Sequence, residues 1–273
     1  CVPFTPAQQT DDELLERRKS HKLNGESVAN MNVSVIMSVY NGERFLREAV
    51  LSILNQTFSD FEFLIVDDAS TDATPQILRD LAAQDNRIRV LTNATNLGLT
   101  KSLNHALRLP LDRSTSSRLW VAQDGFIARM DADDVALPQR LEKQIAFLQT
   151  HPEIGILGTA YQFIDDVGNV ICEKFPLFHD KQIRNALIRH NPFLHSSVII
   201  RKKLLDRVQG YDENHHRAQD YDLWLRVAPL TKFANLPDIL MQKRFTRTMI
   251  SFSREKEQIR CALHIRLEAL RRK

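Results

Sequence analysis

In the first half of the chain, short apolar runs alternate with segments of helical periodicity. The runs over 33–39, 61–66, 87–91 and 126–130 have the alternation or the β-branched content typical of strands. Between them, apolar residues recur every three or four positions, as on one face of an amphipathic helix. This order predicts an α/β fold with a Rossmann-like, mostly parallel central sheet and right-handed crossovers.

Polar residues follow three of these predicted strands. Tyr40, Asp68 and the pair Asp131 and Asp133 all stand at strand ends. In such sheets the ligand crevice lies at the carboxyl ends of the strands, so we expect these segments to converge on one crevice. Neither G-x-G-x-x-G nor a P-loop occurs in the sequence, which argues against a dinucleotide dehydrogenase and a P-loop NTPase.

The segment 129–134 contains three carboxylates within four residues, directly after an apolar run. Carboxylates this close repel one another, and a cation is the usual remedy. Hard oxygen ligands suit Mg²⁺ or Mn²⁺, which commonly share their coordination shell with substrate phosphates. A solvated acidic turn is the alternative, whereas a helix N-terminus that attracts acids is compatible with metal binding. An EF-hand loop is rejected because Val135, Ala136 and Pro138 do not fit its pattern.

The second half of the chain has a mixed pattern. It predicts helices over 139–150 and 219–228, strands over 154–159 and 196–201, and a hairpin turn at 165–169. We therefore expect a smaller, mixed half beside the parallel one.

Composition excludes several classes of function. The formal net charge is only +3, so there is no electrostatic case for a nucleic-acid partner. No apolar run approaches the roughly 20 residues of a membrane span, and no signal-peptide pattern occurs. Cys1, Cys172 and Cys261 form neither a metal spacing nor a pairing pattern, which fits a reducing cytosol. We therefore expect a cytoplasmic protein.

Three further segments stand apart from these patterns. Residues 1–30 are polar and weakly patterned, so we expect a poorly ordered extension before a domain at 31–252. Residues 112–123 are a Ser-rich insertion, predicted to be a loop. Residues 253–273 carry seven Lys/Arg against three Glu and predict a basic helix. Such a helix can contact the inner face of the cell membrane peripherally; a solvated helix or an oligomer contact is the alternative.

Six segments of the chain occur in an order typical of one enzyme family. They are Val33–Gly42, Ile53–Glu62 leading into Val66–Asp72, Asn96–Leu99 with Asn104, Asp131–Asp134, His195–Val198 and Gln219–Arg226. Together they resemble an inverting glycosyltransferase of the GT-A type, family 2, of the kind used for bacterial surface polysaccharides. The resemblance implies the nucleotide-diphospho-sugar transferase fold, with 31–135 binding the nucleotide-sugar and 136–252 binding the acceptor.

The resemblance implies a nucleotide-sugar site at the ends of the first two strands. Tyr40 would lie against the nucleobase and Asp68 would hydrogen-bond its edge, which suits a ligand with one flat face and one polar edge. Ser38 and Asn41 would also contact the nucleotide-sugar. Without the resemblance, Asp68 is equally well explained as a turn residue beside the following helix.

The resemblance also implies a metal site and a catalytic base. Asp133 would bind Mn²⁺ or Mg²⁺ directly, and Asp131 would ligate it or lie nearer the ribose, with Asp134 behind them. Asp220, at the start of a predicted helix, would take the proton of the acceptor hydroxyl. The family usually has Glu before this residue, where the chain has Gln219. The alternative role of Asp220 is an acid that stabilises a helix N-terminus.

Two more residues would lie on the diphosphate or acceptor side. His195 would sit near the diphosphate or the metal, and Trp224 would floor the acceptor site by stacking on a sugar. The alternatives are a hydrogen-bonded core histidine and a core tryptophan. The Q-x-x-R-W pattern of processive synthases is absent, so transfer of one sugar per event fits better than polymerisation.

These expectations combine into one functional hypothesis. The chain would be a metal-dependent inverting glycosyltransferase that moves one sugar from a nucleotide-sugar, with a UDP-sugar favoured, to a hydroxyl of a glycan or lipid-linked acceptor. A sugar nucleotidyltransferase is the first alternative, but it needs a Gly-rich phosphate loop where this chain has Tyr40-Asn41-Gly42. A non-catalytic nucleotide-sugar-binding protein is the second.

Overall fold

The computed structural model of the chain describes residues 33–108, 125–245 and 261–266. Residues Asn32–Lys273 form one compact unit. The predicted extension at 1–30, the insertion at 112–123 and most of the basic segment 253–273 lie outside the described residues, whereas 261–266 is helical. In the described part, no helix is long and apolar enough to cross a membrane.

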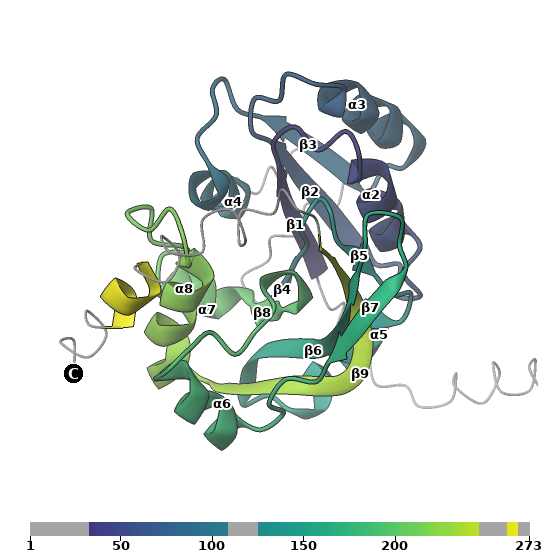
Figure 1. Ribbon diagram of the computed structural model, residues 1–273. Helices are drawn as coiled ribbons and strands as arrows, with labels where there is room; N and C mark the ends of the chain where they lie inside the picture. Colours follow the sequence, from purple (N-terminus) through teal and green to yellow (C-terminus); the bar gives the residue numbers. More distant parts are fainter. Residues whose placement is uncertain (1–32, 109–124, 246–260, 267–273) are drawn as a thin grey trace, which may run out of the picture. The chain divides into compact units, whose positions relative to one another are not determined.

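Four parallel strands form the first part of the sheet, as the sequence predicts. They are β1 (Val33–Val39), β2 (Phe61–Asp67), β3 (Ile88–Thr92) and β4 (Phe126–Arg129), in the spatial order β3-β2-β1-β4. The intervening helices are α2 (Leu46–Leu54), α3 (Thr74–Gln84) and α4 (Leu99–Leu107). Figure 1 shows α4 on one side of these strands, with α2 and α3 on the other. Both faces are covered, so β1 and β2 are buried at nearly every position and most of their residues are apolar.

The same sheet continues through the second half in mixed orientation. The additional strands are β5 (Val135–Ala136), β6 (Ile154–Ile164), β7 (Val170–Lys174), β8 (Ile199–Arg201) and β9 (Lys232–Arg244). The spatial order runs β4-β8-β6-β9-β5, and β7 pairs with β6 as a hairpin. The helices of this half are α5 (Arg140–Thr150), α6 (Asp180–Leu187), α7 (Lys202–Arg207) and α8 (Gln219–Val227), with 3-10 turns η1 (His195–Ser197) and η2 (Ala228–Leu230).

The structure differs from the predicted elements at three places. The first part of the predicted strand 196–201 is the 3-10 turn η1, because the Ser197 hydroxyl and backbone N–H both bond to the carbonyl of Leu194. Helix α6 and strand β9 were not predicted. Pro237 interrupts the apolar pattern of β9, and the β6–β9 register shifts there.

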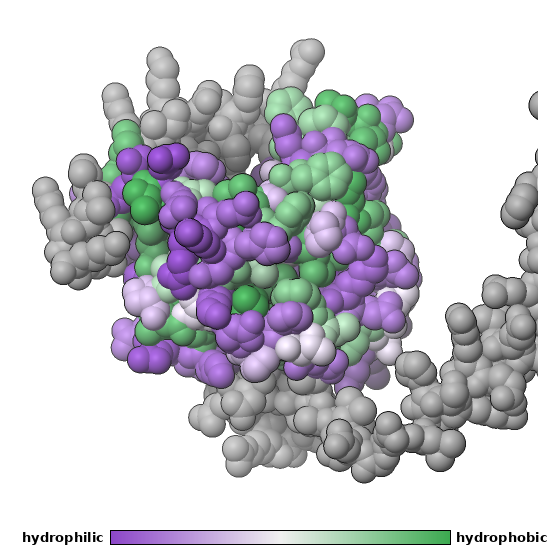
Figure 2. Space-filling view, turned by 90° about the horizontal axis from the view of Figure 1, so that it is seen from below, coloured by the Kyte–Doolittle hydropathy of each residue, from purple (hydrophilic) through white to green (hydrophobic). Residues whose placement is uncertain are grey.

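One hydrophobic cluster joins the two halves of the sheet. It contains Ile36 and Leu64 of the parallel strands together with Trp224 of α8 and Phe233 of β9. The cluster therefore fixes α8 against the parallel sheet. On the outer face seen in Figure 2, hydrophobic residues are interspersed among hydrophilic ones.

Candidate active site

A cluster of carboxylates follows β4, as the sequence predicts. One ligand oxygen from each of Asp131, Asp133 and Asp134 lies within 4.8 Å of the others. Burial, reinforced by the charge of Asp131, raises the pKa of Asp133 to about 6. Burial and the charges of both neighbours raise the pKa of Asp134 to about 7. The cluster therefore concentrates negative charge that the protein only partly neutralises.

Arg129 is the cation closest to this cluster in the sequence. Its side chain is fully buried, and its guanidinium lies 2.5 Å from the Asp131 carboxylate. Burial alone would raise the pKa of Asp131, but the charge of Arg129 helps to hold it below its usual value. The Nε atom of Arg129 has no hydrogen-bond partner among the described residues. The Arg129 guanidinium thus keeps Asp131 ionised.

Asp134 anchors the acidic loop rather than pointing toward a ligand. Its Oδ2 accepts a hydrogen bond from the Ser196 hydroxyl at 2.5 Å, and its Oδ1 accepts one from the Arg244 backbone N–H at 3.0 Å. The buried Arg244 guanidinium also donates to the carbonyl of Asp133 and pairs with Glu48 of α2. The loop is therefore tied to β9, η1 and α2, which leaves Asp131 and Asp133 half-buried in front.

The donor set fits a hard divalent cation. It consists of carboxylate oxygens, the ligands preferred by Mg²⁺ and Mn²⁺, at mutual distances compatible with one ion. The raised pKa values of Asp133 and Asp134 show a repulsion that such an ion would relieve. Asp131 and Asp133 are the residues that would hold it.

Lys243 on β9 supplies a second positive charge near the cluster. Burial lowers the pKa of its ammonium, but the charges of Asp134, Asp131 and Asp133 outweigh this effect and raise the pKa above its usual value. The same ammonium also acts on the carboxylate of Asp220. Lys243 therefore lies within electrostatic reach of both acidic groups.

The predicted nucleotide residues lie at the end of β1. Tyr40 is 51% exposed, so its ring is available to a ligand. Asn41 adopts the left-handed conformation, with φ of 50°, and its Oδ1 accepts a 2.8 Å hydrogen bond from the Thr71 N–H. Ser38 lies within β1, beside Val66 of β2, and is partly exposed. These contacts hold the β1 and β2 loops together.

Asp68 lies at the end of β2 and organises the adjacent loop. Its Oδ1 accepts hydrogen bonds from the Asn93 side chain at 2.7 Å and the Leu97 N–H at 2.8 Å. Its Oδ2 accepts one from the Gly98 N–H at 2.8 Å. A carboxylate oxygen has two acceptor sites, so Oδ2 retains capacity for a donor on a ligand. Asp68 is buried, and these contacts give it a structural role in the loop.

Asp220 lies in the first turn of α8. Ala218 precedes this helix in the left-handed conformation, with φ of 54°, which turns the chain sharply into α8. The Asp220 carboxylate accepts hydrogen bonds from the Asn191 amide at 2.6 Å and from the Tyr221 N–H at 2.9 Å. Burial raises its pKa, and these two bonds offset part of the rise. A carboxylate with a raised pKa is suited to accept a proton.

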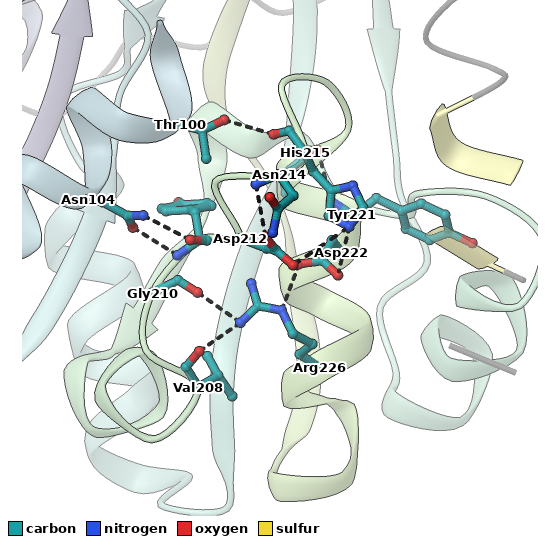
Figure 3. A network of polar contacts seen from close by, with 12 residues as sticks. Thr100, Asn104, Val208, Gly210, Asp212, Asn214, His215, Tyr221, Asp222 and Arg226 are labelled. Atoms are coloured by element: carbon teal, nitrogen blue, oxygen red, sulfur yellow. Dashed lines mark hydrogen bonds and ion pairs between the residues drawn. The ribbon is translucent and has the colours of Figure 1, made fainter. Parts of the chain in front are cut away.

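The loop 209–218, which leads into α8, is fastened from two helices (Figure 3). Asn104 of α4 donates to the carbonyl of Tyr211 at 2.8 Å and accepts its backbone N–H at 2.9 Å. Arg226 of α8 donates to two backbone carbonyls at 2.9 Å, and its Nε lies 2.6 Å from Asp222. These contacts fix where α8 begins and hence where its first acid lies.

A second group of potential metal ligands occurs in the same loop region. Ligand atoms of Asp212, His215 and Asp222 lie within 4.8 Å of one another. The Arg226 guanidinium already pairs with Asp222, so this group holds a positive charge of its own (Figure 3). We therefore assign it to loop anchoring.

His195 lies beside Tyr211, and Trp224 belongs to the hydrophobic core. The His195 Nε2 is 2.9 Å from the Tyr211 hydroxyl, and burial lowers the pKa of the imidazole to about 3, so it is neutral at physiological pH. Trp224 is fully buried and packs edge-on against Phe193 and His195. Neighbouring residues therefore cover the indole ring. Trp224 supports Phe193 and His195 and presents no face on which a sugar could stack.

Four residues of this site were missed from the sequence. The sequence indicates a role for Arg129, because a cation at the end of an apolar strand and before three acids is favoured to pair with one of them. No such indication exists for Asn191, Lys243 and Arg244. They stand in segments without a clear pattern and reach the site only through the fold.

The fold and the site together define the class of protein. A sheet that is parallel in its first part, with an acidic cluster after β4 and a half-buried acid on α8, is the arrangement of a GT-A glycosyltransferase. The chain belongs to glycosyl transferase family 2, whose family model matches residues 34–208.

Curated relatives agree with this assignment. An uncharacterized glycosyltransferase of Methanocaldococcus jannaschii is 35% identical over 230 residues, which cover 83% of this chain and 75% of that protein. The O-antigen biosynthesis glycosyltransferase WbnJ of Escherichia coli is 32% identical over 218 residues, which cover 78% of this chain and 79% of that protein.

Solved structures share the fold. TarS of S. aureus in complex with UDP-GlcNAc has a TM-score of 0.63 and 23% identity, covering 80% of this chain and 60% of that one. The mannosyltransferase PcManGT of Pyrobaculum calidifontis, in complex with GDP-Man and Mn²⁺, has a TM-score of 0.63 and 19% identity, covering 95% and 72%. At these identities the likeness establishes the fold alone.

Proposed function

We propose that this glycosyltransferase moves one sugar, with inversion, from a nucleotide-sugar to a hydroxyl of a glycan or lipid-linked acceptor in surface-polysaccharide biosynthesis. The relative WbnJ, named for O-antigen biosynthesis, supports the polysaccharide setting. A UDP-sugar is the favoured donor; one fold neighbour was solved with UDP-GlcNAc and another with GDP-Man and Mn²⁺. The donor would lie at the ends of β1 and β2, against Tyr40, with Ser38, Asn41 and Asp68 around it.

One observation carries this proposal: a group of three carboxylates that fits one divalent cation and a separate carboxylate oriented by Asn191, that of Asp220, both lie within electrostatic reach of the buried Tyr211. Burial raises the pKa of the Tyr211 hydroxyl, and the charges of Asp220 and Asp131 add to the rise. That hydroxyl lies 2.9 Å from the His195 Nε2. A donor diphosphate near Asp131 and an acceptor hydroxyl near Asp220 would thus meet within one site.

Asp220 performs the proton transfer in this mechanism. Its carboxylate accepts the proton of the acceptor hydroxyl while that oxygen attacks the anomeric carbon from the face opposite the diphosphate. The bond from the anomeric carbon to the diphosphate oxygen breaks, and the new glycosidic bond has the inverted configuration. Asn191 orients the carboxylate through its 2.6 Å hydrogen bond.

The charge on the departing diphosphate is balanced at the other end of the site. Asp131 and Asp133 would hold a divalent cation, which would supply Lewis-acid stabilisation of that charge. The Lys243 ammonium adds a fixed positive charge of the chain. Arg129 keeps Asp131 ionised, and Arg244 holds the backbone of Asp133.

Calorimetric titration of nucleotides tests the proposal. UDP, GDP and dTDP are each added with and without Mn²⁺ to the protein and to Asp133→Ala. Metal-dependent binding of one nucleotide, lost in the variant, is the expected result. The matched control is Asp60→Ala, an exposed acid directly before β2, which should bind like the parent protein. Absence of binding by folded protein would overturn the proposal and favour a protein without transferase activity.

A further inference from the structure

A pocket of about 280 Å³ lies between the β6–β7 hairpin and the chain that follows α6. Tyr161 of β6, Lys174 at the end of β7 and Phe175 form one wall, and His190, Asn191 and Phe193 form the other. The mechanism above uses only Asn191 among these residues. The other residues that line the pocket have no role in that mechanism.

Asn191 joins this pocket to the proposed base. It lines the pocket, and its amide Nδ2 donates to Asp220 Oδ2 at 2.6 Å. Its Oδ1 accepts the Phe193 N–H at 3.1 Å, which fixes the orientation of the amide. On the other wall, Tyr161 pairs with Met241 of β9, two residues before Lys243. A molecule in the pocket therefore contacts the side chain that is hydrogen-bonded to Asp220, and Tyr161 of the opposite wall belongs to the strand paired with β9.

The pocket wall formed by Phe175 and the residues after it is held in place. Asn235 of β9 donates through its side chain to the carbonyl of Leu177 at 2.6 Å, and its N–H donates to the carbonyl of Phe178 at 3.2 Å. Phe175 is 58% exposed, although the residues that follow it are fixed by these hydrogen bonds. An exposed aromatic ring on an anchored segment is preformed for a ligand and costs little ordering entropy on binding.

The chemistry of the walls matches a sugar ring. A pyranose has an apolar face of C–H groups and a rim of hydroxyls, so it needs an aromatic ring below it and hydrogen-bonding groups beside it. Phe175 and Tyr161 supply the rings, while Lys174, His190 and Asn191 supply polar groups. At about 280 Å³ the pocket lies just below the roughly 300–1,000 Å³ of usual ligand pockets, so its size suits a single sugar unit.

We propose that this pocket binds the terminal sugar ring of a glycan acceptor, with its apolar face on Phe175 and Tyr161 and one hydroxyl directed to Asp220. The inference rests on the proposed glycosyl transfer and adds where the acceptor lies and which part of it is recognised. The proposed occupant is the sugar. The alternative that the experiment tests is a lipid phosphate bound by Lys174 and His190.

Saturation-transfer NMR tests the occupant directly. The protein, with diamagnetic Mg²⁺ and the nucleotide selected by calorimetry, is mixed with the methyl glycosides of glucose, galactose, mannose, rhamnose and N-acetylglucosamine, and separately with farnesyl phosphate. We expect transfer to ring protons of at least one glycoside. Transfer to farnesyl phosphate alone, or to none of the probes, would overturn the inference.

Two matched variants locate the binding site. Phe175→Ala should weaken the affinity for the glycoside on the order of tenfold, because it removes the stacking face. Ile171→Ala, at a site 54% exposed on the same hairpin and outside the pocket, should leave that affinity unchanged. Equal glycoside affinity in Phe175→Ala and the parent protein would place the sugar elsewhere.

Nucleotide calorimetry on the same samples separates the two proposals. Phe175→Ala should bind the nucleotide as tightly as the parent protein, since the donor residues lie at the ends of β1 and β2. If nucleotide binds and no glycoside does, the pocket inference fails while the proposed transfer stands. If no nucleotide binds to folded protein, the proposed function itself fails.

Discussion

Two regions of this molecule bury carboxylates, and the causes of their raised pKa values differ. In the cluster after β4, burial and mutual repulsion raise the pKa of Asp133 to about 6 and that of Asp134 to about 7. At the start of α8, burial raises the pKa of Asp220, and hydrogen bonds from Asn191 and Tyr221 oppose the rise.

The difference indicates what each region can do. Repulsion among several carboxylates is relieved by one divalent cation, which binds two of them at once. For a single carboxylate held by a neutral amide, the cost of burying its negative charge is removed most simply by taking up a proton. The same residue type thus suits metal binding in one region and proton transfer in the other.

The largest expected effect comes from Asp220→Asn. The amide has the same shape but cannot take the proton, so kcat should fall by about 10³. The Kd for nucleotide and Mn²⁺ should not change, because the variant leaves the acidic cluster intact. Steady-state kinetics and calorimetry measure the two values, with Asp60→Asn as control. A kcat within tenfold of the parent value would remove Asp220 from the role of base.

Asp133→Asn should affect binding where Asp220→Asn does not. Loss of one ligand should weaken Mn²⁺-dependent nucleotide binding by at least about tenfold. The same change removes one of three repelling charges, so the metal-free variant should be more stable than the parent protein at pH 8. Urea denaturation in EDTA measures this gain. A less stable metal-free variant would show that repulsion does not dominate in the cluster.

The metal-free parent protein should lose stability as pH rises from about 4 to about 8. Asp133 and Asp134 have pKa values of about 6 and about 7 in the folded chain, against an ordinary 3.8. Over this interval the folded chain retains protons that the unfolded chain has released, so unfolding becomes easier with rising pH. Urea midpoints in EDTA at several pH values measure the effect, and Mn²⁺ should reverse it at pH 8. A midpoint that rises with pH would contradict the expectation.

The smallest effect is a shift in the pH profile of Asn191→Ala. Activity requires ionised Asp220, so kcat should fall on the acidic side as pH drops through the pKa of that carboxyl. The Asn191 hydrogen bond favours the ionised form, and its loss should move this acidic limb to higher pH. Profiles of kcat against pH for both proteins measure the shift. An unchanged limb, with kcat merely reduced, would indicate that Asn191 does not tune the base.

The parallel half of the fold was predictable because its signals are local. Strands β1, β2 and β4 are short apolar runs, and polar residues follow them within one or two positions. The second half was less predictable. Strand β9 carries Pro237 and Asp238 within its run, and its place between β6 and β5 depends on pairings with distant residues.

The sequence alone determined the parallel α/β order and the acidic cluster after β4, because periodicity and adjacency along the chain encode both. Only the tertiary structure decided how the pKa values and hydrogen-bond partners of the carboxylates differ. Asn191 meets Asp220 across 29 residues, and Arg244 meets the backbone of Asp133 across 111. A pKa depends on burial and on neighbouring charges, and these neighbours come together only when the chain has folded.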